Sequence, residues 1–149
     1  MHLRLFGALG VLSACWTGAP HSAAAPNPRD ELPDPPAPYA TVAGRWEGIG
    51  HQYDDDSDWE IVMRLHATAP VGEPIGTIEY PSLGCSSELV RKRERAGTFT
   101  VQERLLENPE ERCIDGGTIQ LHRRGRSLEW RWFDADGNEG ASSVLTRVR

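Results

Sequence analysis

The residues most suited to chemistry are one acidic side chain and several aromatic ones on the apolar face of predicted strands. Glu103 alternates in phase with Val101 and Leu105, which places it on the inward face of its strand. A carboxylate there would pair with an arginine or meet a ligand amine, unless a bulge or the strand end turns it outward. The inward aromatic side chains would stack on a ligand or fill the core. With Glu103 they form the candidate ligand-binding set: Trp59, Tyr80, Phe99, Trp130 and Trp132.

Residue types that support catalysis or bind metals are scattered through the chain. His51, His66 and His122 are isolated, and no serine lies in a Gly-x-Ser-x-Gly turn. Residues 134–139 resemble part of a calcium loop, but the distal bidentate glutamate is missing, and Asp-Gly-Asn also suits a tight hairpin turn. The turn is the favoured interpretation. We therefore predict no catalytic residue, no metal site and no cofactor.

The elements that must position these residues are short β-strands. Apolar and polar residues alternate in several runs, turn signals separate the runs, and no stretch predicts a helix. Residues 42–149 are thus predicted to form one all-β domain, an eight-stranded antiparallel up-and-down barrel, with a β-sandwich as the alternative. The predicted strands are 44–52, 57–67, 75–81, 85–93, 97–107, 112–122, 126–134 and 138–148.

Two short motifs make this domain similar to the calycins, which are the lipocalins and their relatives. Gly44-Arg45-Trp46 opens the first predicted strand, and Arg147 lies in the last. In that family, a Gly-x-Trp on the first strand packs against an arginine of the final strand. The resemblance implies that Gly44, Trp46 and Arg147 mark the closed end of a lipocalin-like barrel, and that a ligand would enter at the other end.

The first residues of the chain predict export and anchoring. One positive charge followed by a short uncharged run over residues 1–14 is typical of a signal peptide and too short to span a membrane. Leu12-Ser13-Ala14-Cys15 resembles the bacterial lipobox, which implies cleavage before Cys15 and lipidation of that residue. More than one acyl chain on Cys15 would anchor the protein stably. The alternative is an ordinary secretory signal that is cleaved after Ala24.

A proline-rich tether is predicted over residues 15–41, because seven of the 11 prolines fall there and no long apolar run does. The expected location is the extracytoplasmic side of a bacterial cell envelope. Trp16 after the cysteine lacks the acidic signal for inner-membrane retention, which favours the outer membrane, facing the periplasm.

The up-and-down order predicts which loops share an end of the barrel. Cys85 and Cys113 fall at the same end, and Cys15 would carry the lipid, so we predict a Cys85–Cys113 disulfide. The same end collects the acidic residues of 54–58, 107–115 and 134–136, while the other end is basic. The acidic mouth could attract a cationic ligand or a basic partner protein, or serve only as a solvated surface.

Composition limits the classes of function. The 149 residues carry a formal net charge of -6, which argues against nucleic acid as a partner, and 38% hydrophobic residues do not suit a polytopic membrane protein. We expect a non-enzymatic, lipid-anchored binding protein that takes a small ligand or a cell-envelope component in its barrel. The alternative is a lipoprotein that inhibits or senses another protein through its acidic loops, as lysozyme inhibitors do.

Overall fold

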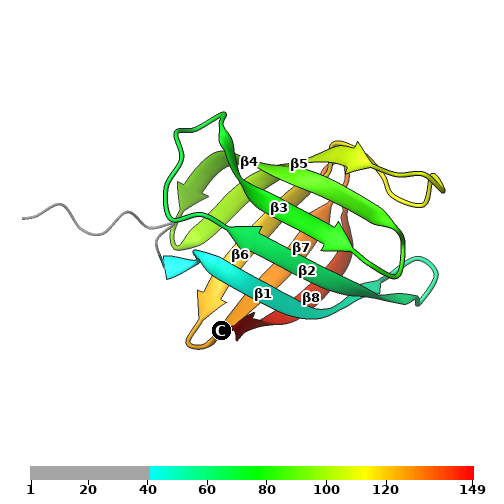
Figure 1. Ribbon diagram of the computed structural model, residues 1–149, viewed down its shortest axis with the longest axis horizontal. Coiled ribbons are helices and arrows are strands. Elements are labelled where there is room, and N and C mark those ends of the chain that lie inside the picture. The colour runs from blue at the N-terminus through cyan, green and yellow to red at the C-terminus, as the bar shows by residue number, and fades with distance from the viewer. Residues whose placement is uncertain (1–40) are drawn as a thin grey trace, which may run out of the picture. The chain divides into compact units, whose positions relative to one another are not determined.

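The computed structural model describes residues 41–149, which close into a barrel of eight antiparallel strands (Figure 1). Each strand pairs with the next in sequence, and the last pairs with the first, so that Trp46 lies opposite Arg147. The predicted up-and-down barrel is confirmed, and the sandwich alternative is ruled out. The strands are β1 (Gly44–Gln52), β2 (Asp58–Leu65), β3 (Pro74–Tyr80), β4 (Cys85–Arg95), β5 (Thr98–Glu107), β6 (Thr118–Arg124), β7 (Ser127–Phe133) and β8 (Glu139–Val148).

The strand bounds agree with the prediction to within about two residues, except at β6. That strand was predicted over 112–122, but residues 108–117 form a loop instead. Asn108 folds the loop on itself, because its amide donates to the Cys113 carbonyl at 2.9 Å and its side-chain oxygen accepts from the Cys113 N–H at 3.2 Å. Side-chain hydrogen bonds of this kind compete with a strand ladder for backbone groups, and here they delay the start of β6.

The core follows from the two-residue period of the strands. In β2, Trp59, Ile61, Met63 and Leu65 are buried, whereas Glu60 and Arg64 between them are exposed. The other strands contribute inward residues in the same way, and the largest fully buried side chains come from every strand except β5. They are Trp46, Trp130, Ile61, Met63, Ile75, Ile78, Leu89, Ile119, Leu121, Leu128 and Leu145.

Trp46 and two arginines close one end of the barrel. The Trp46 side chain is fully buried, and its indole N–H donates to the Val42 carbonyl at 2.8 Å. The guanidinium carbon of Arg147 lies 5.8 Å from the Trp46 ring centroid, and that of Arg123 lies 5.3 Å away. Both distances fall in the range of cation–π contacts. Arg147 lies on the tryptophan, as the calycin resemblance implied, whereas Arg123 was not anticipated.

Gly44 leaves the space that Arg147 needs. Its φ is +127°, and a Cβ on this residue would lie 2.9 Å from Nε of Arg147. Any other residue would therefore strain the backbone and displace the arginine from Trp46.

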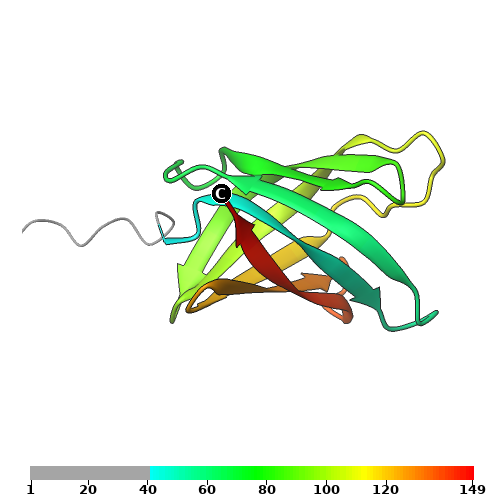
Figure 2. The ribbon, with the colours of Figure 1, turned by 60° about the horizontal axis from the view of Figure 1, so that its bottom comes forward.

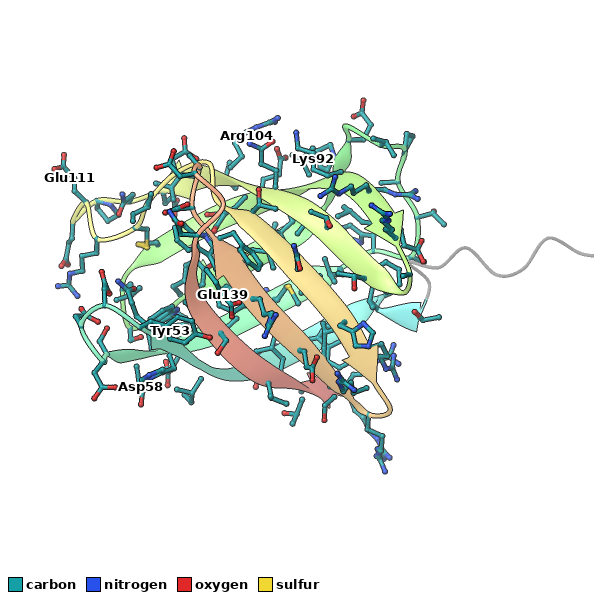
Figure 3. The ribbon with its side chains drawn as sticks, turned by 180° about the vertical axis from the view of Figure 1, so that it is seen from behind. Tyr53, Asp58, Lys92, Arg104, Glu111 and Glu139 are labelled. Carbon is teal, nitrogen blue, oxygen red and sulfur yellow. A yellow bond between two sulfur atoms is a disulfide. The ribbon has the colours of Figure 1, made fainter. Side chains whose placement is uncertain are left out.

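The loops alternate between two oppositely charged ends (Figures 1 and 2). Loops 53–57, 81–84, 108–117 and 134–138 lie at the end opposite Trp46, and the first, third and fourth of these together carry eight acidic residues. The tight β4–β5 and β6–β7 hairpins lie at the Trp46 end and are rich in arginine. The acidic Asp58 and Glu111 and the basic Lys92 accordingly lie towards opposite ends of the barrel (Figure 3). We call the end opposite Trp46 the acidic end and the Trp46 end the closed end.

Candidate ligand-binding site

A cavity of about 430 Å³ lies at the acidic end of the barrel. Strands β1, β2, β3, β5, β7 and β8 and all four loops of this end contribute lining residues. Pockets that bind small molecules commonly measure about 300–1,000 Å³. The cavity is therefore large enough for a small organic ligand but not for a long lipid chain with its headgroup.

Five aromatic side chains line the cavity: Trp59 of β2, Tyr80 of β3, Trp130 and Trp132 of β7, and Tyr53 of the 53–57 loop. The first three are buried, and Trp132 is partly exposed. Glycines make room for Trp132, because a Cβ on Gly117 would lie 2.0 Å from its indole nitrogen. Trp132 thus lies directly over the end of the 108–117 loop.

Glu103 is the buried acid of this site. Only 2% of it is exposed, so the inward orientation is the one that the structure adopts. One carboxylate oxygen accepts from the Trp132 indole N–H at 3.1 Å, and the other, Oε1, has no hydrogen-bond partner. The backbone N–H of Glu103 donates to the Gly117 carbonyl at 2.8 Å, which ties its position to the same loop.

The surroundings of Glu103 oppose its ionisation. Burial raises the pKa of the carboxyl above its ordinary value, and the nearby Ser87, Tyr80 and Trp132 donors offset part of that rise. The negative charge of Asp115 raises the pKa further. None of the side chains that shift the pKa of Glu103 is basic, so none of them acts as a counter-ion to its carboxylate.

Other buried polar atoms beside Glu103 are also unsatisfied. The Ser87 hydroxyl lies close enough to affect the carboxyl group, but it does not reach hydrogen-bond geometry with any partner. The indole N–H groups of Trp59 and Trp130 likewise have none. Burial, and next the charge of Glu103, raise the pKa of Tyr80 well above its usual range, so its phenol stays a neutral donor. An unsatisfied buried group costs about 1–3 kcal/mol, which makes this cluster expensive for the fold alone.

The rim of the cavity is mainly acidic. Asp54, Asp134 and Glu139 line it, together with a single basic residue, Arg112, which is paired with Glu110. Asp54 accepts a hydrogen bond from Gln52 at 2.7 Å, and Glu139 accepts one from the Tyr53 hydroxyl at 2.9 Å (Figure 3). These contacts hold the two carboxylates at the entrance, and Glu139 is also ion-paired with Arg131 at 3.5 Å.

The calcium-like segment is a hairpin turn. The Asp134 carboxylate accepts from the backbone N–H groups of Asp136 at 2.9 Å and Asn138 at 2.8 Å, and Gly137 has a φ of +86°. Hydrogen bonds from Asn138 are the largest cause of the lowered pKa of Asp134. Within residues 41–149, no three histidine, cysteine, aspartate or glutamate side chains converge as metal ligands would.

The disulfide between Cys85 and Cys113 forms as predicted, with an S–S distance of 2.06 Å across 28 residues. Cys85 begins β4, and Cys113 lies in the 108–117 loop and lines the cavity. The bond therefore fixes the 108–117 loop to the barrel. This loop lies under Trp132, and its Gly117 carbonyl accepts the Glu103 N–H.

Five of the six candidate ligand-binding residues line this cavity, and Phe99 does not. Phe99 pairs with Leu121 and Glu94 near the start of β5, towards the closed end, and belongs to the hydrophobic core. Phe99 faces inward as predicted, but it does not line the cavity, so its assignment to a ligand wall at this site was wrong. Ser87 was not among the predicted site residues, although it alternates in phase with the buried Cys85 and Leu89.

No protein-family model matches the chain, and no curated protein or solved structure is significantly similar to it. Residues 41–149 contain no helix that is long and apolar enough to cross a membrane.

Proposed function

We propose that this protein is a non-enzymatic, extracytoplasmic binding protein whose barrel takes up a small ligand in the cavity at its acidic end. The observation that carries the proposal is the buried Glu103, which lines a ligand-sized cavity and has an unpartnered oxygen and no basic neighbour acting on its pKa. Folding alone gives no reason to keep such a group, because an apolar residue would fill the position at lower cost. Binding does give a reason.

The proposal includes a lipocalin-like, or calycin-like, origin for the barrel. Its support is the contact of Arg147 with Trp46, for which Gly44 leaves the space, together with the up-and-down closure of eight strands. In that arrangement the tryptophan end is closed and the opposite end is the mouth, which is where the cavity lies.

The proposed location is the periplasmic face of a bacterial outer membrane, with Cys15 carrying the lipid. Its support is the sequence of residues 1–14 and of the proline-rich tether over 15–41. Apart from residue 41, these segments lie outside the described residues. The membrane partner in this proposal is contacted through the lipid and not through the barrel.

Native mass spectrometry of protein exported to a periplasm and purified gently tests the binding function. A reproducible non-covalent adduct is expected, and its mass would identify the ligand. A matched variant, Ala141→Phe, places a large side chain on the cavity wall and should lose the adduct while keeping the disulfide mass. An adduct that survives in this variant would place the bound molecule elsewhere and contradict the proposal.

A second candidate function is the inhibition or sensing of another protein by the acidic loops. It is favoured by two apolar side chains at the acidic end, Leu106 and Ile114, which are 59% and 64% exposed. Exposed apolar groups within a charged rim are typical of protein interfaces. Binding to a basic lysozyme, abolished by Ile114→Asp and by neutralising Asp54, Asp55 and Asp56, would support this function. Unchanged binding in those variants would contradict it.

A further inference from the structure

We infer that the ligand is an organic cation, a protonated primary or secondary amine on an aromatic or apolar body, whose ammonium group binds at Glu103. The inference rests on the proposed binding function of the cavity and names the chemical class of its ligand.

The charges that line the cavity select the sign of the ligand. Four acidic residues line it, Glu103 at the buried position and three on the rim, against Arg112 alone. Arg112 is already paired with Glu110, and Glu139 is paired with Arg131, which does not line the cavity, so three acidic residues remain without an ion pair in the lining. A concave site with one sign of charge concentrates ligands of the opposite sign, so cations are attracted and anions are repelled.

Glu103 supplies the anchoring contact. Its Oε1 has no partner, while its other oxygen is held by Trp132 at 3.1 Å. The terminal torsion of a glutamate is broad, so a small rotation brings Oε1 toward a ligand without moving the strand. A hydrogen bond between an ammonium and a carboxylate is roughly twice as strong as a neutral one. An ammonium group would therefore neutralise the buried charge and satisfy the free oxygen together.

The aromatic walls select the body of the ligand. Trp59, Tyr80, Trp130 and Trp132 offer ring faces and edges, which attract both cations and flat apolar groups. A hydrated metal ion would gain little from such walls, because hard cations require several oxygen ligands. An amine attached to a ring or a short hydrocarbon uses both properties of the cavity.

The unsatisfied acceptors favour an amine that carries N–H bonds. Oε1 of Glu103 and the oxygen of the Ser87 hydroxyl are both buried, and neither receives a hydrogen bond. Of the two residues, Glu103 lines the cavity, so a primary or secondary ammonium can donate to its carboxylate, whereas a quaternary ammonium has no hydrogen to donate. This difference separates an amine site from a general cation site.

Four probes of similar size test the inference: 3-phenylpropylamine, its N,N,N-trimethyl derivative, 3-phenylpropanol and 3-phenylpropionate. Titration calorimetry on the mature chain with Cys15→Ser should show the amine binding about tenfold to hundredfold more tightly than the alcohol. The trimethyl derivative should be weaker than the amine, and the carboxylate should not bind. Glu103→Gln should reduce the amine to the affinity of the alcohol, and Glu107→Gln, at the exposed end of the same strand, should change nothing.

The other outcomes separate this inference from the binding function. Equal binding of the amine, the alcohol and the carboxylate would overturn the inference and leave the cavity as a ligand site. Equal binding of the amine and its trimethyl derivative would overturn the N–H contact at Glu103, and with it the inference. If none of the probes binds, the inference fails, and the native adduct decides separately whether the binding function stands.

Discussion

Replacing Glu103 with glutamine should make the ligand-free protein more stable at neutral pH. Glutamine has nearly the same size, so the cavity and the neighbouring tryptophans keep their packing. Its side-chain carbonyl can accept the Trp132 N–H that now lies 3.1 Å from the carboxylate. Its amide group takes the place of the unpartnered Oε1 near the Ser87 hydroxyl, which is itself an unsatisfied acceptor. The substitution therefore removes a buried charge and offers a donor to a buried acceptor.

The magnitude follows from the one unsatisfied group that is removed. A buried polar group without a partner costs about 1–3 kcal/mol, so Glu103→Gln should raise the free energy of unfolding by about that amount. The gain should depend on pH. Burial raises the pKa of Glu103 in the folded state, so the folded protein binds more protons than the unfolded chain between the two pKa values. Wild-type stability attributable to Glu103 thus falls as the pH rises through this window, whereas glutamine does not titrate.

Urea denaturation of both proteins at acidic and at neutral pH measures this effect. Below the ordinary carboxyl pKa of about 4.3, Glu103 is protonated in both states, and the advantage of glutamine should largely disappear. The control Glu107→Gln should stay within about 0.5 kcal/mol of wild type. If Glu103→Gln proves less stable than wild type at neutral pH, the carboxylate is satisfied by the fold, and the argument for an unpaired buried acid is refuted.

Three further predictions concern other parts of the molecule. Replacing Cys85 and Cys113 with alanine should lower the free energy of unfolding by about 3.5 kcal/mol, because the disulfide no longer restricts a 28-residue loop in the unfolded chain. Guanidinium denaturation measures the loss, and a value below about 1 kcal/mol would contradict this expectation. Gly117→Ala should displace Trp132 and shift tryptophan emission toward that of exposed indole, because the added Cβ would lie 2.0 Å from the indole nitrogen. Gly116→Ala strains the backbone at a φ of +81° but meets no neighbouring atom, so it is the control for backbone strain alone and should leave the emission unchanged. Cys15→Ser should move the protein from the membrane fraction to the soluble periplasm, and continued membrane attachment would rule out the lipid anchor at that residue.

Alternation along the strands predicted which face a residue occupies but not its height in the barrel. Trp59 and Glu103 face inward as the two-residue period predicts, and the alternative that a bulge or the strand end turns Glu103 outward is not the one adopted. Phe99 and Trp132 share that inward phase, yet one lies in the core towards the closed end and the other at the mouth. The tilt and stagger of strands set this height, and they depend on pairing between segments far apart in sequence.

The predicted bounds of β6 were wrong at both ends. The loop of residues 108–117 is held by Asn108 and by the Asp115 carboxylate, which accepts the Leu105 N–H at 2.8 Å. These contacts do not follow from hydrophobic periodicity, so β6 was predicted to begin too early. The strand was also predicted to end at residue 122, which left Arg123 outside the predicted strands, and the position of Arg123 over Trp46 was missed. The disulfide was predictable because loop alternation alone brings Cys85 and Cys113 to one end.

The pairing of β1 with β8 has a consequence for how the chain folds. Arg147 donates to the Ala43 carbonyl across 104 positions, so the barrel closes through contacts between its two ends in sequence. Until β8 is available, β1 and β7 each present an unpaired edge, and such edges invite pairing with other chains. Contacts of high sequence separation also slow folding, because chain entropy is lost before they form. Closure at Trp46 therefore requires nearly the whole chain, and partly synthesised or truncated forms should aggregate through these two edges.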